Sequence, residues 1–374
     1  MFMNKHIMNN VTASAYTQAR KKLRHTAFKE LSDDIVAIQY EDPTGNKLWK
    51  NFRLLGVDGS RIILPSSTEI VEEFGTITVK NHTEESTYSC ATFECCYDVL
   101  NHLAITGILC KGIIYEPELA LQILNITTEN DILIYDRGYC SFKFIATLLQ
   151  QKKNFIIRCQ KSCFEAADAF FNKKSIDEVI TLKVPKRHHK EFQNLNLPLE
   201  LSIRFVAVVL STGETEVLIT SVIDQNITKE DFKELYGLRW EIETFFGILK
   251  GRLSLENFTG LSVESIKQDF WSTIFMSNYE TIVTYDANQE LQQESATLKQ
   301  KQKVNKAVSF NVIKHQAFNI LLDSTEDNKS KMQKLKILFK YASVPTREGR
   351  NPIRKKYSAT RSCNFLRRKK KHIF

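Results

Sequence analysis

The 374-residue sequence contains no apolar run long enough to span a lipid bilayer. Its opening segment, MFMNKHIMNN, lacks the apolar centre of a secretory signal peptide. We therefore expect a cytoplasmic protein with no membrane partner.

The eight cysteines include no CxxC pair. They are scattered, with Cys95 and Cys96 adjacent, and this spacing fits reduced thiols in a cytoplasm better than a disulfide framework. Cys159 and Cys163, followed by the His188–His189 pair, are spaced too irregularly for the known zinc patterns. We expect no zinc site there.

Acidic residues are fewer than basic ones, which leaves a net charge of +9. This excess predicts a polyanionic partner. Much of it lies in the C-terminal tail, where REGRNPIRKKY and LRRKKKHIF contain almost no acid. Such a tail is either a solvated, disordered segment or a non-specific contact for nucleic acid.

The first 160 residues predict alternating helices and strands. Residues 13–34 have helical spacing, and FRLLGVDGSRIILP predicts a strand, a tight Asp-Gly turn and a second strand. Two strand-like runs follow, TYSCATFECCYDVL and HLAITGILCKGIIY, and Pro117 then opens a helix.

The next elements complete an α/β pattern. DILIYDRGY predicts a strand ending at Asp136, FKFIATLLQQ a helix, and NFIIRCQ another strand. This rhythm predicts a mixed sheet flanked by helices. Residues 161–226 contain three β-branched runs with no convincing helix between them, and we interpret them as a β-rich insertion. Helices dominate from Thr228 onward.

The segment LYGLRWEIETFFGILKGR predicts a helix with one polar stripe. Steps of 3, 4 and 7 residues place Tyr236, Arg239, Glu243 and Lys250 within an arc of about 60°. Leucine, isoleucine and phenylalanine fill the adjoining arc. The stripe is either a solvated face with weak ion pairs or a set of groups that holds a phosphate beside a metal ion.

Two upstream aspartates bear on that choice. Asp58 can simply belong to a hairpin turn, and Asp136 can simply cap the following helix. Alternatively, both converge with Glu243 at one edge of the sheet. Three close carboxylates take up protons or bind divalent cations, and oxygen-only ligands favour Mg²⁺ or Mn²⁺. A pair of such ions, about 3.5–4 Å apart, catalyses phosphodiester displacement.

This arrangement resembles bacterial insertion-sequence transposases of the DDE class, specifically the insertion-sequence-four family with its Y-R-E-K signature. The matching segments are LLGVDGS, ILIYDRGY and YGLRWEIETFFGILK. The resemblance implies a ribonuclease-H-like core interrupted by a β-rich insertion, with Asp58, Asp136 and Glu243 as the metal-binding catalytic triad. It implies Mg²⁺ or Mn²⁺, two ions in all, as cofactor.

The resemblance also implies a reaction and a partner. Water activated at the triad would cut double-stranded DNA at the element's ends, and the freed 3′-hydroxyl would attack target DNA, with the protein acting as a dimer or higher multimer at the bacterial nucleoid. Tyr236, Arg239 and Lys250 would hold phosphates near the cut end and support a hairpin intermediate. Trp240 would stack on an unpaired base, or it is an aromatic packed at the core edge.

Family members carry a helical DNA-binding region ahead of the segment AYTQARKKL, and only a short stretch precedes it here. We therefore expect an N-terminal truncation or an internal start. The expected organisation has five parts, which are a helical remnant (1–50), the first part of the core (51–160), the β-rich insertion (161–226), the second part of the core with the catalytic helix (227–300), and a helical, basic C-terminal region (301–374).

Three functions remain open from the sequence. The first is a metal-dependent DNA transposase. The second is a catalytically inactive, DNA-binding remnant of one, which would bind DNA in a salt-sensitive way without breaking strands. The third is a metal nuclease that cuts without strand transfer.

Overall fold

The computed structural model describes residues 12–41, 45–80, 85–210, 213–322 and 327–346. The predicted basic tail lies outside the described residues. In the described part of the chain, no helix is both long enough and apolar enough to cross a membrane.

A mixed sheet of nine strands forms the centre of the described residues, in the order β2-β3-β1-β5-β6-β9-β8-β7, with β4 pairing on β3. β1 runs antiparallel to β3 and parallel to β5, and β5 runs parallel to β6. This confirms the predicted mixed sheet and is consistent with a ribonuclease-H-like core. The strands are β1 Arg53–Ile63, β2 Thr76–Lys80, β3 Glu85–Asp98, β4 Leu103–Lys111, β5 Asp131–Tyr135, β6 Asn154–Cys159, β7 Asp177–Lys183, β8 Glu200–Val209 and β9 Thr215–Thr220.

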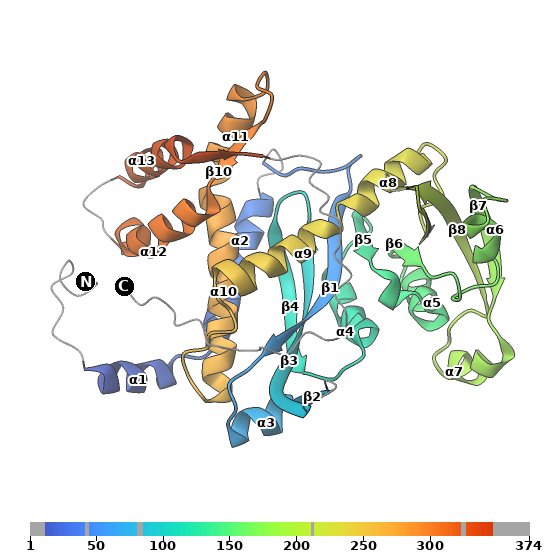
Figure 1. Ribbon diagram of the computed structural model, residues 1–374, viewed down its shortest axis with the longest axis horizontal. Coiled ribbons are helices and arrows are strands. Elements are labelled where there is room, and N and C mark those ends of the chain that lie inside the picture. Colours follow the sequence, from blue (N-terminus) through green and yellow to red (C-terminus); the bar gives the residue numbers. More distant parts are fainter. Residues whose placement is uncertain (1–11, 42–44, 81–84, 211–212, 323–326, 347–374) are drawn as a thin grey trace.

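Helices cover both faces of this sheet (Figure 1). On one face α9 crosses β1 and β3, and α10 runs beside α2; on the other face lie α4 and α5. Each face has its own buried apolar cluster. The helices named so far are α2 Thr26–Glu41, α4 Glu116–Ile123, α5 Phe142–Gln150, α9 Trp240–Gly247 and α10 Val263–Val283.

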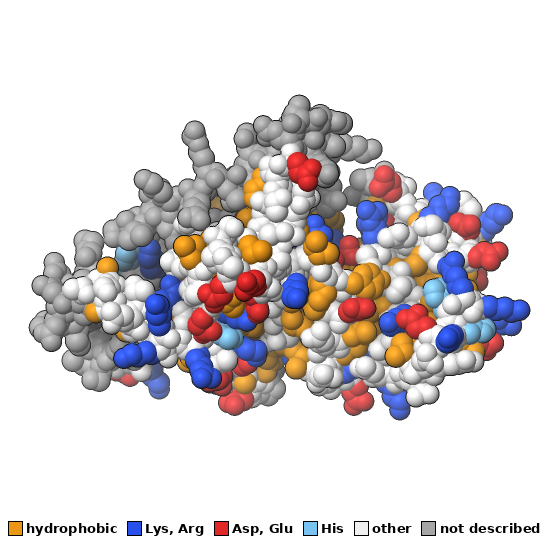
Figure 2. Space-filling model, turned by 90° about the horizontal axis from the view of Figure 1, so that it is seen from below, with side chains coloured by type: hydrophobic (Ala, Val, Ile, Leu, Met, Phe, Trp, Pro, Cys, Tyr) orange, Lys and Arg blue, Asp and Glu red, His pale blue; other side chains and the backbone are white. Residues whose placement is uncertain are grey.

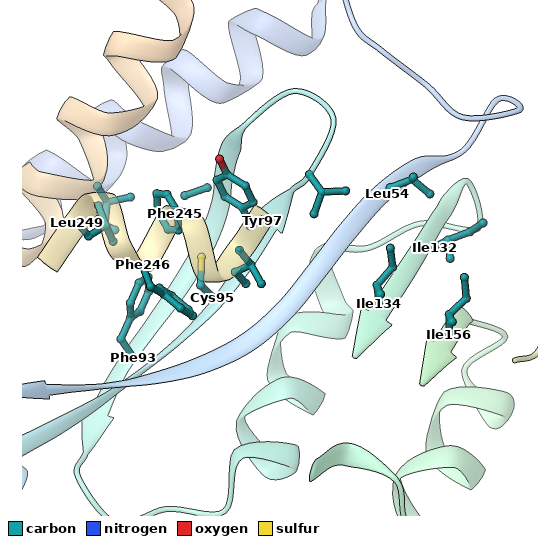
Figure 3. Close-up of a cluster of buried hydrophobic side chains, with 14 of the residues drawn as sticks. Leu54, Phe93, Cys95, Tyr97, Ile132, Ile134, Ile156, Phe245, Phe246 and Leu249 are labelled. Carbon is teal, nitrogen blue, oxygen red and sulfur yellow. The ribbon is translucent and has the colours of Figure 1, made fainter. Parts of the chain in front are cut away.

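Aromatic packing fixes α9 on the sheet (Figure 3). The ring of Phe245 stacks on Tyr97 of β3 with centroids 4.5 Å apart, and Phe246 meets Phe93 edge-on at 5.6 Å. Such pairs add to the burial of their area. The position of α9 over the sheet is therefore set by its apolar side, as the sequence predicted.

Two predictions for the first third of the chain are wrong in detail. The segment around Asp58 is one continuous strand rather than a hairpin, because β3 pairs along its whole length, with Asp58 opposite Cys95 and Gly59 opposite Glu94. Residues 13–34 form two helices rather than one, α1 Ala13–Lys22 and the first part of α2. Pro117 lies in the first turn of α4, as predicted.

The β-rich segment also differs from its prediction. Its three strands are present, but β9 pairs antiparallel with β6, so β7, β8 and β9 extend the central sheet. We refer to these three strands as the extension. Two short helices, α6 Ala167–Phe171 and α7 His189–Asn194, contradict the expectation of a helix-free segment. Helices this short leave no periodic pattern that a sequence reading can detect.

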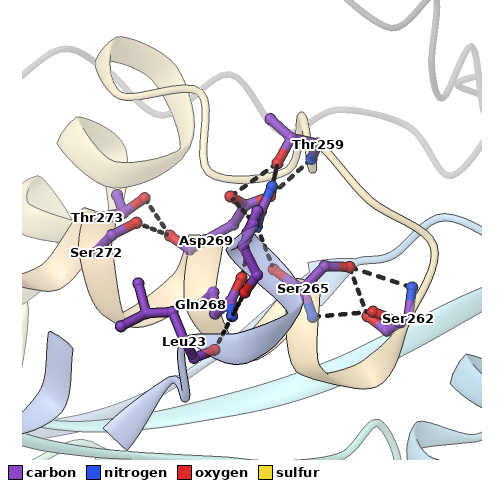
Figure 4. Close-up of polar contacts among 9 residues, drawn as sticks. Leu23, Thr259, Ser262, Ser265, Gln268, Asp269, Ser272 and Thr273 are labelled. Carbon is purple, nitrogen blue, oxygen red and sulfur yellow. Dashed lines mark hydrogen bonds and ion pairs between the residues drawn. The ribbon is translucent and has the colours of Figure 1, made fainter. Parts of the chain in front are cut away.

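The N-terminal helix α1 is fixed to α10 by polar contacts around Asp269 and Gln268 (Figure 4). The Arg20 guanidinium on α1 donates to Gln268 at 2.7 Å and to Asp269 at 3.0 Å. The remaining elements are α3 Thr68–Phe74, α8 Lys229–Gly237, α11 Tyr285–Glu294, β10 Gln302–Val304, α12 Lys306–Leu322, α13 Asn328–Tyr341 and β11 Ser343–Pro345.

Candidate active site

The register of two parallel strands places Asp58 and Asp136 side by side. Gly56 of β1 is the partner of Ile134 of β5, so the residues two positions further along are Asp58 and Asp136. Neighbouring strands lie about 4.8 Å apart. Asp136 follows the last residue of β5, and its Oδ1 accepts a hydrogen bond from the Gly138 N–H at 2.6 Å. Asp136 therefore caps the short 3-10 turn Arg137–Tyr139, whereas the predicted helix α5 is capped by Ser141, so the predicted cap of that helix is wrong.

A glycine lets α9 approach this edge of the sheet. A Cβ on Gly56 would lie 3.6 Å from Ile242 of α9 and 3.2 Å from Val99. Ile242 is fully buried. Because Ile242 packs directly on the strand, the next residue, Glu243, is brought to the side of β1 that carries Asp58.

The Arg239 guanidinium joins two of the three predicted acids. Its Nη2 donates to Glu243 Oε1 at 2.7 Å, and its Nη1 lies 3.5 Å from Asp58 Oδ2. Arg239 is 6% exposed, and its Nε has no hydrogen-bond partner in the described residues. A single buried cation thus holds these two carboxylates together, with one donor unused.

Burial raises the pKa of Asp58 to about 7. The Arg239 guanidinium opposes this shift, and the carboxylate of Asp136 adds to it. Groups whose pKa is moved this far by burial and by a specific charged neighbour are concentrated at functional sites. The same shift also arises when carboxylates are placed to bind a cation that would favour their ionised form.

The predicted continuous helix is interrupted at Leu238 and Arg239. α8 ends at Gly237, α9 begins at Trp240, and the bonds from Arg239 N to Tyr236 O and from Ile242 N to Arg239 O have i to i−3 spacing. A π-helical turn, Ile248–Arg252, follows α9. The prediction of one continuous helix is therefore wrong, because the chain departs from 3.6 residues per turn at both places.

Two members of the stripe are displaced from its centre. Tyr236 is buried, and its ring centre lies 5.9 Å from the Arg239 guanidinium carbon. Burial raises the pKa of the Tyr236 phenol. Lys250 donates from Nζ to the Arg61 carbonyl, further along β1, and burial lowers its pKa.

Trp240 is 44% exposed, and its ring lies 4.9 Å from the Arg239 guanidinium carbon. More than half of the Trp240 surface is covered, so both predicted roles, packing at the core edge and stacking on a base, remain compatible with its position. An exposed indole beside a buried cation offers a surface on which a base can stack.

The donor set is suited to a hard divalent cation. Asp58, Asp136 and Glu243 offer only carboxylate oxygens, the ligands that Mg²⁺ and Mn²⁺ prefer. In the described residues, no three acidic, histidine or cysteine side chains are gathered closely enough to hold an ion as they stand. Bringing Asp58 and Glu243 onto one ion would require Arg239 to leave its place between them.

A hollow opens next to Arg137, the residue that follows Asp136. It measures about 620 Å³ and lies where β6 ends and β9 begins. Its lining holds three cations, Arg137, Arg158 and Lys161, against two acids, Asp168 and Glu216, and we refer to it as the basic hollow. Arg158 pairs with Glu216 at 2.8 Å. The sequence reading missed this hollow, although Arg137 lies within the DRGY motif.

Two further carboxyl groups were also missed. Glu94 of β3 is fully buried, and Glu116 opens α4. Both interact electrostatically with Asp58 and Asp136. The only signal in the sequence was Glu94 itself, an acidic residue within the mostly apolar segment CATFECCY.

A sequence model described as the transposase DDE domain matches residues 54–279, which include all three predicted acids. The chain belongs to this transposase family.

One relative is the transposase InsG for insertion sequence element IS4 of Escherichia coli (strain K12). It is 23% identical over 273 residues, an alignment that covers 72% of this chain and 60% of the relative. The chain therefore spans less than two thirds of that relative's length. A similar solved structure, the cryo-EM structure of a piggyBac transposase synaptic complex with hairpin DNA, has a TM-score of 0.42 and 10% identity, and covers 76% of this chain and 57% of the other.

Proposed function

We propose that this chain is a metal-dependent DNA transposase that cleaves the ends of an insertion sequence and transfers the resulting 3′-hydroxyl into target DNA. The observation that carries the proposal is the meeting of Asp58 and Glu243 on one guanidinium, with Asp136 beside Asp58 on the adjacent strand. The family membership supports the same chemistry.

Asp58, Asp136 and Glu243 would hold Mg²⁺ or Mn²⁺, two ions in all, which would supply activation of the attacking oxygen and stabilisation of the leaving oxygen. In this proposal Arg239 holds the carboxylates together in the free protein. With the carboxylates occupied by a cation, the Arg239 guanidinium would be available to a DNA phosphate, a ligand whose geometry it matches.

The other residues would position the DNA. The phenol of Tyr236 and the ammonium of Lys250 would contact phosphates on either side of the cut, and Trp240 would stack on an unpaired base. The basic hollow would receive the phosphodiester backbone that leads away from the cut. We also propose that the protein acts as a dimer or larger multimer on paired ends, in the cytoplasm at the nucleoid.

The test is cleavage of DNA carrying the cognate ends, which are sought as inverted repeats flanking the coding region. Wild-type protein with Mg²⁺ or Mn²⁺ should produce cut and joined products, which a gel separates from nicked ones. Asp58→Ala, Asp136→Ala and Glu243→Ala should each reduce cleavage by on the order of a thousandfold or more, because metal-ion catalysis contributes several kcal/mol.

Each alternative outcome would support a different conclusion about the function. Robust cutting by one of these variants would remove that residue from the catalytic role. Nicks without joined products would indicate a nuclease. Salt-sensitive DNA binding without strand breaks at any metal concentration would indicate an inactive, DNA-binding remnant.

A further inference from the structure

Glu94 is a buried carboxyl group with half of its hydrogen-bonding capacity unused. It is 0% exposed, and its Oε1 accepts a hydrogen bond from the Tyr139 hydroxyl at 2.7 Å. Its Oε2 has no partner in the described residues. Leaving a buried carboxyl oxygen unpaired costs free energy, so a native structure that keeps one calls for a reason.

The unpaired oxygen points at the same place as a second carboxyl group. Glu94 lies opposite Gly59 in the sheet, and a Cβ on Gly59 would lie 2.9 Å from Glu94 Oε2 and 2.8 Å from Glu116 Oε1. Both acid groups therefore rest against the bare backbone of Gly59. Any larger side chain at this position would push them away.

This pair approaches the active site from the opposite face of β1. Successive side chains of a strand alternate in direction, so the Gly59 position faces away from Asp58 and towards α4. Asp136 directly follows the last residue of β5, and its carboxylate interacts electrostatically with Asp58 on one face of β1 and with Glu94 and Glu116 on the other. Tyr139, the partner of Glu94, lies in the short helical turn that Asp136 caps.

The electrostatics agree with this placement. Burial raises the pKa of Glu116, and the nearby carboxylate of Asp136 raises it further, while Arg61 opposes the shift. Burial likewise raises the pKa of Glu94, and Glu116, Asp58 and Asp136 add to the effect. Four carboxyl groups thus interact across β1, whereas the Arg239 ion pairs involve only Asp58 and Glu243.

We propose that Glu94 and Glu116 are two further carboxylate ligands for the divalent cation that Asp136 helps to hold. This rests on the proposed function and extends it, because the metal centre then has ligands on both faces of β1. Glu116 is half-buried at the first turn of a helix and can turn towards Asp136. The oxygen of Glu94 that has no partner would gain one in the cation.

The test measures Mn²⁺ binding to the full chain without DNA, by isothermal titration calorimetry and by the electron paramagnetic resonance signal of free Mn²⁺. Glu116→Gln and Glu94→Gln keep the size of the side chain and remove its charge. Each should weaken Mn²⁺ binding about 10- to 100-fold or remove one bound ion. Glu118→Gln is the matched control, because Glu118 lies in the same first turn of α4 and is exposed.

A third variant tests the geometry. Gly59→Ala leaves every carboxylate in the protein but crowds the ends of Glu94 and Glu116, so it should weaken Mn²⁺ binding in the same direction. Circular dichroism establishes that each variant is folded. Should Glu94→Gln fail to fold, Glu116→Gln decides the matter, because its side chain is partly in solvent.

The outcomes separate this proposal from the proposed function. If Glu116→Gln binds Mn²⁺ as the wild type does, while Asp136→Asn does not, the additional ligands are wrong and the transposase proposal stands. If Asp58→Asn and Asp136→Asn also bind as the wild type does, the metal centre itself is wrong. If Glu118→Gln weakens Mn²⁺ binding as much as Glu116→Gln does, the effect comes from the net charge of the protein rather than from a ligand, and the proposal is overturned.

Discussion

Two buried arginines show how the extension and the candidate active site differ. Arg204 of β8 is 1% exposed; it donates from Nε and Nη2 to Asp177 at 2.7 and 2.6 Å, and from Nη1 and Nη2 to the carbonyls of Asp224 and Ile227 at 2.8 and 2.9 Å. Arg239 is nearly as buried, yet its Nε is unpaired and its contact with Asp58 is 3.5 Å long.

The comparison separates groups that hold the fold from groups held ready for a ligand. In the extension, a buried charge has all its donors satisfied inside the protein. At the site, Arg239 and Glu94 each keep an unpaired polar atom. A folded chain tolerates such unpaired groups mainly where a substrate or ion will later satisfy them.

The largest effect on stability is expected in the extension. Arg204→Ala should lower the free energy of unfolding by about 3–5 kcal/mol, because it leaves the Asp177 carboxylate and two carbonyls without their buried partner. Urea unfolding followed by circular dichroism measures it. A loss below 1 kcal/mol would mean that water replaces the guanidinium and that the two arginines do not differ as described.

Arg239→Ala should make the protein more dependent on metal. Without the guanidinium, Asp58 and Glu243 repel one another, and a divalent cation relieves that repulsion. Saturating Mn²⁺ should then stabilise the variant against unfolding by about 2–3 kcal/mol at a hundredfold excess over Kd, and the wild type by less. The readout is the thermal midpoint with and without Mn²⁺. Equal stabilisation of both proteins would contradict the view that Arg239 occupies a cation's place.

The pH dependence of the free energy of unfolding should reveal whether Glu94 is protonated in the folded protein. Its pKa is raised to about 9, so in a chelator the folded protein keeps a proton that the unfolded chain releases at lower pH. The free energy of unfolding of the wild type should therefore fall as the pH rises from about 5 towards 9. Glu94→Gln should flatten this decline and gain about 2 kcal/mol relative to the wild type at pH 9.

Asp58, with a pKa raised to about 7, adds to the decline in the lower part of this range in both proteins. Denaturant titrations at several pH values measure the difference between the two proteins. Parallel curves for wild type and variant would show that Glu94 is already ionised in the folded state.

The smallest effect is expected for the basic hollow. Arg158→Ala with Lys161→Ala should weaken binding to duplex DNA by roughly tenfold and lower the salt dependence of binding. The matched control is Arg187→Ala with Lys190→Ala, in the turn before α7 and in α7 itself. Figure 2 shows Lys and Arg side chains mixed with acidic ones at the right-hand end of the molecule. If both double variants lose the same affinity for DNA, binding depends on the net positive charge of the protein rather than on the basic hollow.

The centre of the sheet was predictable because the strands β5 and β6 are short and strongly apolar. DILIYDRGY and NFIIRCQ carry runs of buried β-branched residues that give the strands β5 and β6 with few alternatives. The hairpin predicted at Asp58–Gly59 was wrong because Asp-Gly most often forms a turn between two strands. Pairing with β3 keeps β1 continuous through this dipeptide, and Cys95, the partner of Asp58, lies more than thirty residues away along the chain.

The site was predictable only as a set of residues. The motifs and the family resemblance proposed the acids and the arginine, but the spacing argument assumed an unbroken helix from Tyr236 to Lys250. The interruption near Arg239 and the π-helical turn leave no signal in the periodic pattern of the sequence. Glu94 and Glu116 belong to different elements, and no spacing rule connects them.

The sequence by itself determined which groups are available for chemistry, through its motifs, and which segments would be strands, through their apolar runs. The tertiary structure decided that Asp58 and Asp136 share a register, that Arg239 stands between Asp58 and Glu243, and that two more carboxyl groups lie beneath Gly59. The physical reason is that hydrogen-bonding preference and hydrophobicity act locally along the chain, whereas charge interaction and burial depend on distance in space.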